Sequence, residues 1–376
     1  MLSVFSSPLR YTQGRHATRS LGKELVSLGL KGPALIVAGK TAVAQLSDIW
    51  KETLDAVDCG YSIHRFGGEC SLGEISRIRQ SAEAIQARVI IGVGGGKALD
   101  AARATSSELG LPFVSCPTLA STDAPCSAVS VIYTESGIVE EVRVLPSNPV
   151  LVLVDTQVIV QAPPRLLASG MGDALATWFE ARACTTSSSK NVRGGSSTLS
   201  ALTLAELCYR TLLAEGAAAL EAARAQEITP AFEHVVEANT LLSGLGFESS
   251  GLAAAHSIHN GLTVAPQTRS FYHGEKVGFG TLVQLVLENG DVSEIEEVLG
   301  FCTDVGLPVT LAQIGLQELP REILDKIASR ATETGESIHN EPFAVRPSMV
   351  ADAILKADEV GRTWWASRKK CACTGE

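Results

Sequence analysis

The first 160 or so residues alternate between short apolar runs and longer segments whose apolar residues have helical spacing. Short apolar runs predict buried strands, and strands that alternate with helices predict a parallel sheet covered by helices on both faces. The expected strands are Pro33–Gly39, Tyr61–Phe66, Arg88–Val93, Pro112–Cys116 and the returning strand Val150–Val154, and the expected helices are Thr41–Val57, Leu72–Gln86 and Ala98–Leu109. Ser130–Tyr133 and Val142–Leu145 predict a hairpin.

The pattern changes after Pro163 and Pro164, where long stretches rich in Ala, Leu and Glu show helical spacing and almost no strand signal. Examples are Ala168–Cys184, Thr198–Glu215, Glu233–Leu245 and Val277–Glu288. A chain of 376 residues also exceeds the size at which one hydrophobic core stops growing. We therefore expect an α/β domain over residues 1–162 and an all-α domain over residues 163–376.

Composition excludes several classes of protein. A formal net charge of −10 argues against a nucleic-acid binder, and no apolar run approaches the ~18 residues of a membrane helix. The nine cysteines are odd in number and form no C-x-x-C, which argues against a disulfide framework and a thiolate zinc site. The N-terminus also lacks the order of a secretory signal, so we expect a reduced, cytoplasmic protein.

A glycine run, G-V-G-G-G-K-A-L-D, follows the expected strand Arg88–Val93 and leads into a helix. Glycines at a helix start leave backbone N–H groups open to a pyrophosphate, because no Cβ intervenes. Gly94, Gly95, Gly96, Lys97 and Asp100 are therefore candidate contacts to a dinucleotide. The run is neither G-x-G-x-x-G nor a P-loop, so a tight turn without a ligand is the alternative.

The next candidate segment, C-P-T-L-A-S-T-D-A-P-C-S, follows the strand Pro112–Cys116. Ligands of α/β sheets bind at the carboxyl ends of the strands. The hydroxyls of Thr118, Ser121 and Thr122 can donate to a phosphate or ribose, and Asp123 can accept a hydrogen bond from a polyol. The alternative is that these hydroxyls cap the following turn.

Three histidines, His256, His259 and His273, lie within eighteen residues of the expected all-α domain. His256 and His259 are three apart and would share one helix face. Two imidazoles and a carboxylate make a three-ligand metal site with an open position, and Asp173 is the best candidate carboxylate. Asp173 could instead be the N-cap of an Ala-rich helix. Serine-nucleophile chemistry is disfavoured because G-x-S-x-G is absent.

Together these segments resemble the glycerol dehydrogenase group of the iron-containing (group III) alcohol dehydrogenase family, over nearly the whole chain. The most specific motifs are F-G-G-E-C-S, G-V-G-G-G-K-A-L-D, P-T-L-A-S-T-D-A-P-C-S-A-V-S-V-I-Y-T, G-M-G-D-A-L-A-T-W-F-E-A-R-A-C and G-F-E-S-S-G-L-A-A-A-H-S-I-H-N-G-L. The resemblance implies a Rossmann-like nucleotide-binding domain, an all-α metal-binding domain and a dehydroquinate-synthase-like architecture.

The resemblance also implies an activity, the oxidation of glycerol and related vicinal diols to dihydroxyacetone and its analogues with hydride transfer to NAD. Carried over by position, the metal ligands are Asp173, His256 and His273, and Asp123 contacts the substrate hydroxyls. The cofactor contacts are Gly96, Lys97, Thr118, Ser127, Val129 and Tyr133. His259 is either a proton-relay group beside the ligands or a satisfied helix histidine. Family members often form homo-oligomers, which we expect here too.

Two departures bear on the cofactors. Thr177 stands where many family members have a fourth ligand, a histidine, so we expect Zn²⁺ rather than Fe²⁺. Lys40 stands where an Asp commonly binds the adenosine ribose, and a cation there would accept the 2′-phosphate of NADP, which weakens the preference for NAD. The rival class with this architecture is a dehydroquinate-synthase-type lyase, disfavoured because few Arg or Lys residues lie near the proposed site.

Overall fold

The computed structural model describes residues 2–135, 137 and 139–374, with side chains up to residue 368. The chain divides into two compact units. The first, here called the α/β unit, comprises Ser6–Pro164 and Ala222–Leu245. The second, here called the helical unit, comprises Met1–Phe5, Arg165–Glu221 and Gly246–Glu376.

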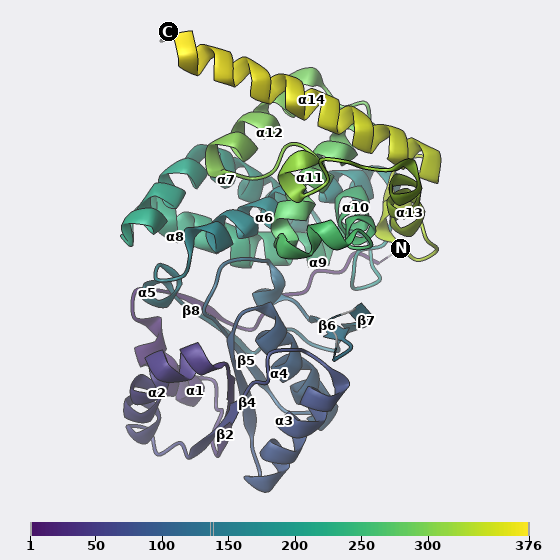
Figure 1. Cartoon of the computed structure of the whole chain (residues 1–376). Coiled ribbons are helices and arrows are strands. Elements are labelled where there is room, and N and C mark those ends of the chain that lie inside the picture. Colours follow the sequence, from purple (N-terminus) through teal and green to yellow (C-terminus); the bar gives the residue numbers. More distant parts are fainter. Residues whose placement is uncertain (1, 136, 138, 375–376) are drawn as a thin grey trace. The chain divides into compact units, whose positions relative to one another are not determined.

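The α/β unit is built on a six-stranded sheet in which every pairing is parallel (Figure 1). Its strands are β1 (Tyr11–Gly14), β2 (Ala34–Ala38), β3 (Tyr61–Arg65), β4 (Val89–Gly94), β5 (Phe113–Pro117) and β8 (Leu151–Asp155), in the order β1-β8-β5-β4-β2-β3. The predicted parallel sheet is thus confirmed. β1 was not predicted, because its sequence Y-T-Q-G has no apolar run; it is a half-buried strand paired with β8.

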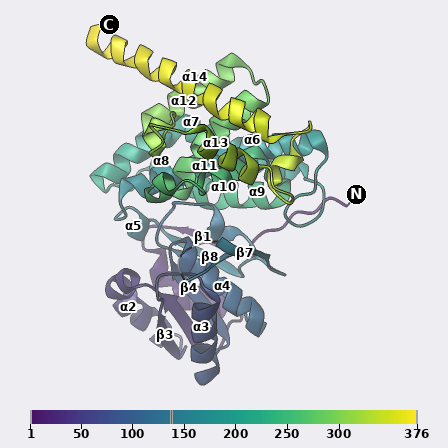
Figure 2. The ribbon, with the colours of Figure 1, turned by 45° about the vertical axis from the view of Figure 1, so that its right-hand side comes forward.

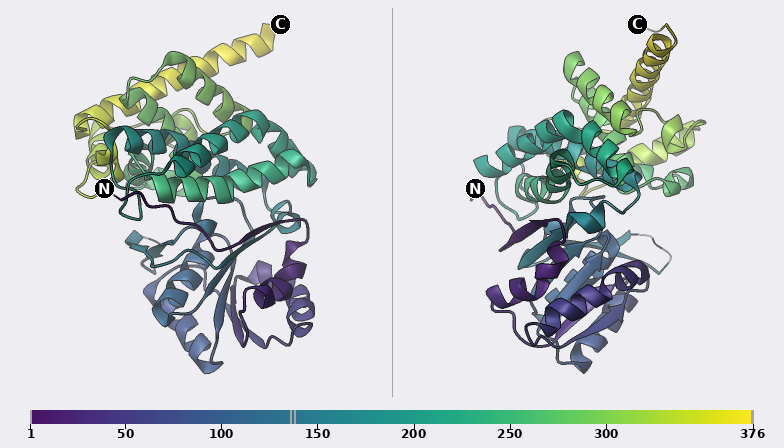
Figure 3. Two further views of the ribbon diagram at one scale, coloured as in Figure 1. Left: turned by 180° about the vertical axis from the view of Figure 1, so that it is seen from behind. Right: turned by 90° about the vertical axis from the view of Figure 1, so that its left-hand side faces the viewer.

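Helices cover both faces of this sheet, as the alternating pattern predicted. Alternate residues of β2 point to opposite faces. Ile36 packs with α1 (Leu21–Ser27) and α2 (Lys40–Asp55), whereas Leu35 packs with α3 (Leu72–Ala84) and α4 (Gly96–Leu109). Figure 3 shows this covering from two further sides. The expected hairpin is the antiparallel pair β6 (Val129–Tyr133) and β7 (Val139–Val144).

The α/β unit also includes a short helical stretch from the later part of the chain, which the predicted boundary at residue 162 placed in the other domain. It contains α8 (Pro230–Glu237) and a π-helical turn, η3 (Ala238–Leu242). Glu233 joins it to the sheet, because its carboxylate accepts hydrogen bonds from Thr156 at 2.7 Å and Gln13 at 2.8 Å. Hydrophobic periodicity cannot reveal such polar attachments.

The remaining elements of the α/β unit are short: η1 (Ala17–Ser20), η2 (Ala124–Cys126) and α5 (Thr156–Ile159). The helical unit has no named strand among its described residues. Its elements are α6 (Pro164–Ser187), α7 (Leu199–Ala225), α9 (Ser243–Ser250), α10 (Ala254–Leu262), η4 (Pro266–Ser270), α11 (His273–Leu287), α12 (Val292–Val305), η5 (Ala312–Ile314), α13 (Arg321–Ala331), η6 (Ser337–Asn340) and α14 (Pro347–Thr374). The end of α7 from Ala222 and the start of α9 up to Leu245 belong to the α/β unit.

One apolar cluster forms the core of the helical unit. Ile258 of α10, Phe279 of α11, Ile327 of α13 and Ile354 of α14 are buried together in it. Figure 2 shows α14, the long C-terminal helix, lying across this bundle. None of the helices in the described residues is both long and apolar enough to span a membrane.

Candidate metal centre and nucleotide-binding turn

Three helices of the helical unit bring the predicted metal ligands together. Asp173 lies within α6, His256 near the start of α10, and His273 is the first residue of α11. Asp173 Oδ1 is 3.0 Å from His273 Nε2 and 3.4 Å from His256 Nε2. One ligand atom from each residue lies within 4.8 Å of the others, and no other such group occurs in the described chain.

These distances fit a divalent cation. Ligand atoms about 2.0–2.1 Å from a tetrahedral Zn²⁺ are separated by about 3.3 Å, close to the two distances measured to Asp173. The donor set, one carboxylate and two imidazoles, is also typical of catalytic sites that keep a position open for substrate. The described residues therefore fit a divalent metal ion.

The alternative role of Asp173, as an N-cap, is wrong. Asp173 lies nine residues inside α6, and the glycines before it belong to the helix. Gly172 is needed because α6 crosses α11 closely: a Cβ there would lie 2.3 Å from the backbone oxygen of Gly274. A Cβ on Gly274 would in turn lie 1.8 Å from the Ser169 oxygen. These glycines permit the contact that places Asp173 beside His273.

The pKa values of Asp173 and His256 are shifted strongly, and in opposite directions. Burial would raise the pKa of Asp173, but the nearby charge of His273 and the hydrogen bonds from both imidazoles hold it well below its usual range. Burial would likewise lower the pKa of His256, but Glu180 and Asp173 together raise it well above the ordinary value. The site therefore has an anionic carboxylate and an imidazole that attracts a cation, whether a proton or a metal ion.

His259 does not reach the ligand atoms but contacts one of the ligands. Its Nε2 lies 3.0 Å from His273 Nδ1, and its Nδ1 lies 3.1 Å from Asn260 Oδ1. Burial and the charges of His273 and Lys276 lower the pKa of His259 well below its ordinary value. It is thus a neutral imidazole hydrogen-bonded to a ligand, and its predicted catalytic role stays a prediction.

Sequence analysis missed Glu180, a fully buried acid in the same helix as Asp173. Its Oε2 is 2.6 Å from His256 Nδ1. The available signal was spacing, because residues seven apart lie on one helix face. Thr177, one turn after Asp173, is also fully buried, and its hydroxyl is no substitute for an imidazole ligand.

The predicted nucleotide turn joins β4 to α4 in the α/β unit. Gly94 has φ +155°, and a Cβ there would lie 2.9 Å from that of Ala98. Gly95 is the N-cap of α4, and a Cβ on Gly96 would meet nothing closer than 3.9 Å. The first N–H groups of α4 are thus not shielded by side chains at these glycines, which suits a pyrophosphate.

Two residues of this turn have partners in the α/β unit. Lys97 Nζ lies 2.7 Å from Glu69 and 4.8 Å from the centre of the Tyr133 ring. Asp100 is buried and paired with Arg103 at 2.8 Å, and burial raises its pKa to about 6. These contacts give Asp100 a structural role, and its predicted contact with the cofactor stays a prediction.

The segment after β5 is held partly by its own backbone. Thr118 donates its N–H to the Gly94 carbonyl at 3.0 Å, and the Ser127 hydroxyl donates to Ala124 at 3.1 Å. Asp123 is buried and accepts a hydrogen bond from Ser243 at 3.1 Å. Contacts of Thr118, Ser121, Ser127, Val129 and Tyr133 with a cofactor remain predictions, as does that of Asp123 with substrate.

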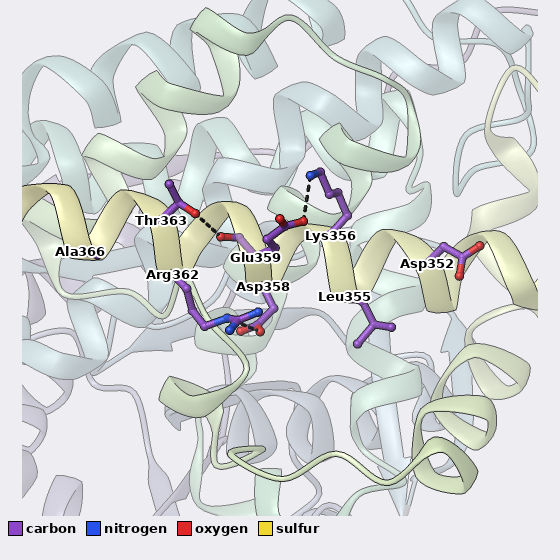
Figure 4. Close-up of a pocket in the computed structure, with 8 residues that line it drawn as sticks. All are labelled: Asp352, Leu355, Lys356, Asp358, Glu359, Arg362, Thr363 and Ala366. Atoms are coloured by element: carbon purple, nitrogen blue, oxygen red, sulfur yellow. Dashed lines mark hydrogen bonds and ion pairs between the residues drawn. The ribbon is translucent and has the colours of Figure 1, made fainter.

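A groove on α14 is unrelated to these residues. Its lining comes entirely from that helix: Asp352, Leu355, Lys356, Asp358, Glu359, Arg362, Thr363 and Ala366. Figure 4 shows two ion pairs among its charged groups, Lys356 with Glu359 at 2.8 Å and Arg362 with Asp358 at 2.9 Å. Because all of its lining residues come from one helix and most of its charged groups are paired, the groove lacks the convergent groups of a catalytic site.

The chain is similar to known proteins over nearly its whole length. The sequence profile of the iron-containing alcohol dehydrogenases matches residues 8–156. A glycerol dehydrogenase of Escherichia coli O6:H1 is 49% identical over 96% of this chain and 97% of its own. A glycolaldehyde reductase of Halobacterium salinarum is also 49% identical, over 96% and 99%.

The fold is shared as well. The crystal structure of glycerol dehydrogenase from Schizosaccharomyces pombe superposes with a TM-score of 0.93 at 37% identity, covering 98% of this chain and 93% of that one. This similarity confirms the predicted fold class, and the near-full-length identities confirm the predicted family. The chain belongs to the iron-containing alcohol dehydrogenase family.

Proposed function

We propose that this protein is a metal-dependent glycerol dehydrogenase, which oxidises glycerol to dihydroxyacetone, and also oxidises related vicinal diols, with hydride transfer to NAD. The observation that carries the proposal is the convergence of Asp173, His256 and His273 on one point. The relatives named glycerol dehydrogenase, at 48–49% identity over nearly full length, support the substrate.

Asp173, His256 and His273 would hold the metal, and the glycine turn at the start of α4 would hold the pyrophosphate of NAD. When bound, a divalent cation lowers the pKa of an alcohol as it does that of water, and NAD accepts the hydride. The side chains of the protein would bind and orient the substrate. Asp123, oriented by Ser243, would accept a hydrogen bond from a substrate hydroxyl, and His259 would act as a proton-relay group beside the ligands or hold the His273 ring in place.

For the metal we propose Zn²⁺ rather than Fe²⁺. Both ions accept two imidazoles and one carboxylate. Thr177 stands one turn after Asp173, and a threonine hydroxyl is a poor fourth ligand, so the protein supplies three ligands. That number is typical of catalytic zinc. Metal analysis of the purified protein, followed by reconstitution of the apoprotein with each ion, decides between them.

The proposed substrates are small molecules. A relative as similar as the glycerol dehydrogenases is named glycolaldehyde reductase, which supports activity on two-carbon hydroxycarbonyl compounds as well. Both compounds place an oxygen on the carbon beside the reacting one. Vicinal diols would therefore be preferred over simple alcohols, because the second hydroxyl can also bind the metal.

The test is a substrate panel followed at 340 nm. Glycerol, 1,2-propanediol, ethylene glycol and 1-propanol are each assayed with NAD and with NADP, before and after chelation of the metal. We expect the diols to react, 1-propanol to react poorly, and chelation to remove the activity. No NADH from any diol with the zinc-loaded protein would refute the proposal, and a dehydroquinate-synthase-type lyase would then be the class to assay.

Two further predictions belong with this function. A cytoplasmic location is supported by the cysteines, because the seven whose side chains are described are all free thiols. We also propose a homo-oligomer, which sedimentation of the purified protein tests.

A further inference from the structure

We propose that Glu180 is the positioning residue of the metal centre: it fixes both the backbone and the ring tautomer of His256, so that Nε2 is available to the ion. This inference rests on the metal centre of the proposed function and adds a residue to it. Glu180 neither belongs to the three ligands nor lies close to them in sequence, except for Asp173, seven residues earlier in α6.

Glu180 holds His256 at two places. One carboxylate oxygen, Oε1, accepts the backbone N–H groups of Ala253 at 2.9 Å and of His256 at 3.0 Å. The other, Oε2, lies 2.6 Å from Nδ1 of the same histidine. The side chain is fully buried, so water does not compete for these contacts. One carboxylate thus fixes where α10 begins and how the His256 ring is turned.

The hydrogen bond to the ring also determines its tautomer. A carboxylate only accepts, so Nδ1 of His256 must carry a proton. The lone pair of a neutral imidazole is then on Nε2, the atom that lies 3.4 Å from Asp173 Oδ1. A ligating histidine whose other nitrogen donates to a carboxylate is fixed in orientation and is a more basic ligand.

The variant Glu180→Gln keeps the shape of the side chain but removes its charge. Its amide has nearly the same size, and its oxygen must stay with the two backbone N–H groups, because the NH₂ group cannot accept them. The NH₂ group then faces Nδ1 of His256 and donates to it. The ring proton must move to Nε2, which is the tautomer that cannot bind the ion.

The same helix start provides a matched control. The two N–H groups between those of Ala253 and His256 are capped by other side chains. Glu341 accepts the N–H of Ala254 at 3.1 Å, and Gln284 accepts that of Ala255 at 2.9 Å. The described hydrogen bonds join neither cap to a histidine ring. Glu341→Gln keeps an oxygen for Ala254, so it alters a buried cap of α10 without altering the hydrogen bond to His256.

The experiment measures metal affinity of the apoproteins, by competition with a chromophoric zinc chelator, and the visible spectrum of the Co²⁺-loaded forms. We expect Glu180→Gln to bind Zn²⁺ about 10–100-fold more weakly than the wild type, with an altered Co²⁺ spectrum, and Glu341→Gln to bind within about twofold of it. Equal affinity of wild type and Glu180→Gln overturns the inference. An equal loss of zinc affinity in both variants also overturns it, because a disturbed cap of α10 would then be enough to explain the weaker binding.

A second measurement does not depend on folding of the variant. In ¹⁵N-histidine-labelled wild-type protein loaded with zinc, the His256 ring should carry its proton on Nδ1, and a proton found only on Nε2 overturns the inference. Failure of the proposed function is distinct: it would be seen as wild-type protein that binds no divalent metal at Asp173, or that binds it and oxidises no diol.

Discussion

Gly274 tests how closely the metal centre depends on helix packing. It lies one residue after the predicted ligand His273, and a Cβ built on it would be 1.8 Å from the backbone oxygen of Ser169 in α6. Carbon and oxygen atoms in ordinary contact are about 3.2–3.5 Å apart, so Gly274→Ala would push α6 and α11 apart by about 1.5 Å. The ligand distances of a metal site lie within about 0.2 Å of their standard values, so a shift of about 1.5 Å would disrupt the site.

We therefore expect Gly274→Ala to lose most of its zinc affinity and to be less stable by about 1–3 kcal/mol, the usual effect of overpacking. Zinc competition and thermal unfolding of the apoprotein measure the two effects separately. Gly300→Ala in α12 is the matched control, because its Cβ would meet the Trp364 ring at an ordinary 3.7 Å. Helix propensity should make that variant about 0.5–1 kcal/mol more stable. If Gly274→Ala also gained stability and kept its zinc affinity, the inferred backbone contact would be wrong.

Three further predictions follow from single side chains. Asp173→Asn should abolish turnover while leaving NAD binding, measured by fluorescence titration, nearly unchanged; near-normal kcat would show that the ligand set is wrong. Lys40→Asp should raise the ratio of kcat/KM for NAD to that for NADP by about 10–100-fold, because a charged contact to the 2′-phosphate is lost; an unchanged ratio rules out this role for Lys40. Burial and then Glu288 raise the pKa of Glu341 from 4.5 to about 9. The folded state therefore favours the protonated acid, and this contribution to stability should be lost as the pH rises from about 4.5 through 9. Glu341→Gln, which cannot ionise, should flatten the pH dependence of thermal unfolding in that window, and an identical slope would contradict the assignment.

Much of the fold followed from periodicity. The strands around the glycine run were predicted because buried parallel strands are continuous apolar runs, and Val89–Gly94 needs no tertiary information to be recognised. β1 was missed because Tyr11–Gly14 is half-buried and partly polar. The assignment of α8 to the wrong domain has a similar cause, since Glu233 attaches it to the sheet through hydrogen bonds rather than through an apolar face.

The three predicted metal ligands were chosen by residue type, and the sequence did not indicate why they lie close together. Histidine is rare and costly to bury, so His256 and His273 were conspicuous in an apolar segment. Glu180 was not conspicuous, because a glutamate in a helix is most often a solvated residue. Asp100 shows the opposite case, since its place in the glycine motif suggested a cofactor contact and the structure gives it a buried partner, Arg103.

Two residues that the sequence did not point to, Gly172 and Glu180, share a physical property: each departs from what its local structure favours. Glycine weakens a helix interior, yet Gly172 lies inside α6, and an isolated carboxylate is costly to bury, yet Glu180 is fully buried. Such departures are expected where function requires them. Asp173 and Glu180 are seven residues apart, so one rigid helix places both on the same face about 10.5 Å apart along its axis. The carboxylate that would bind the ion and the carboxylate that turns His256 toward it therefore move together, and helix packing sets the distance of both from α10 and α11.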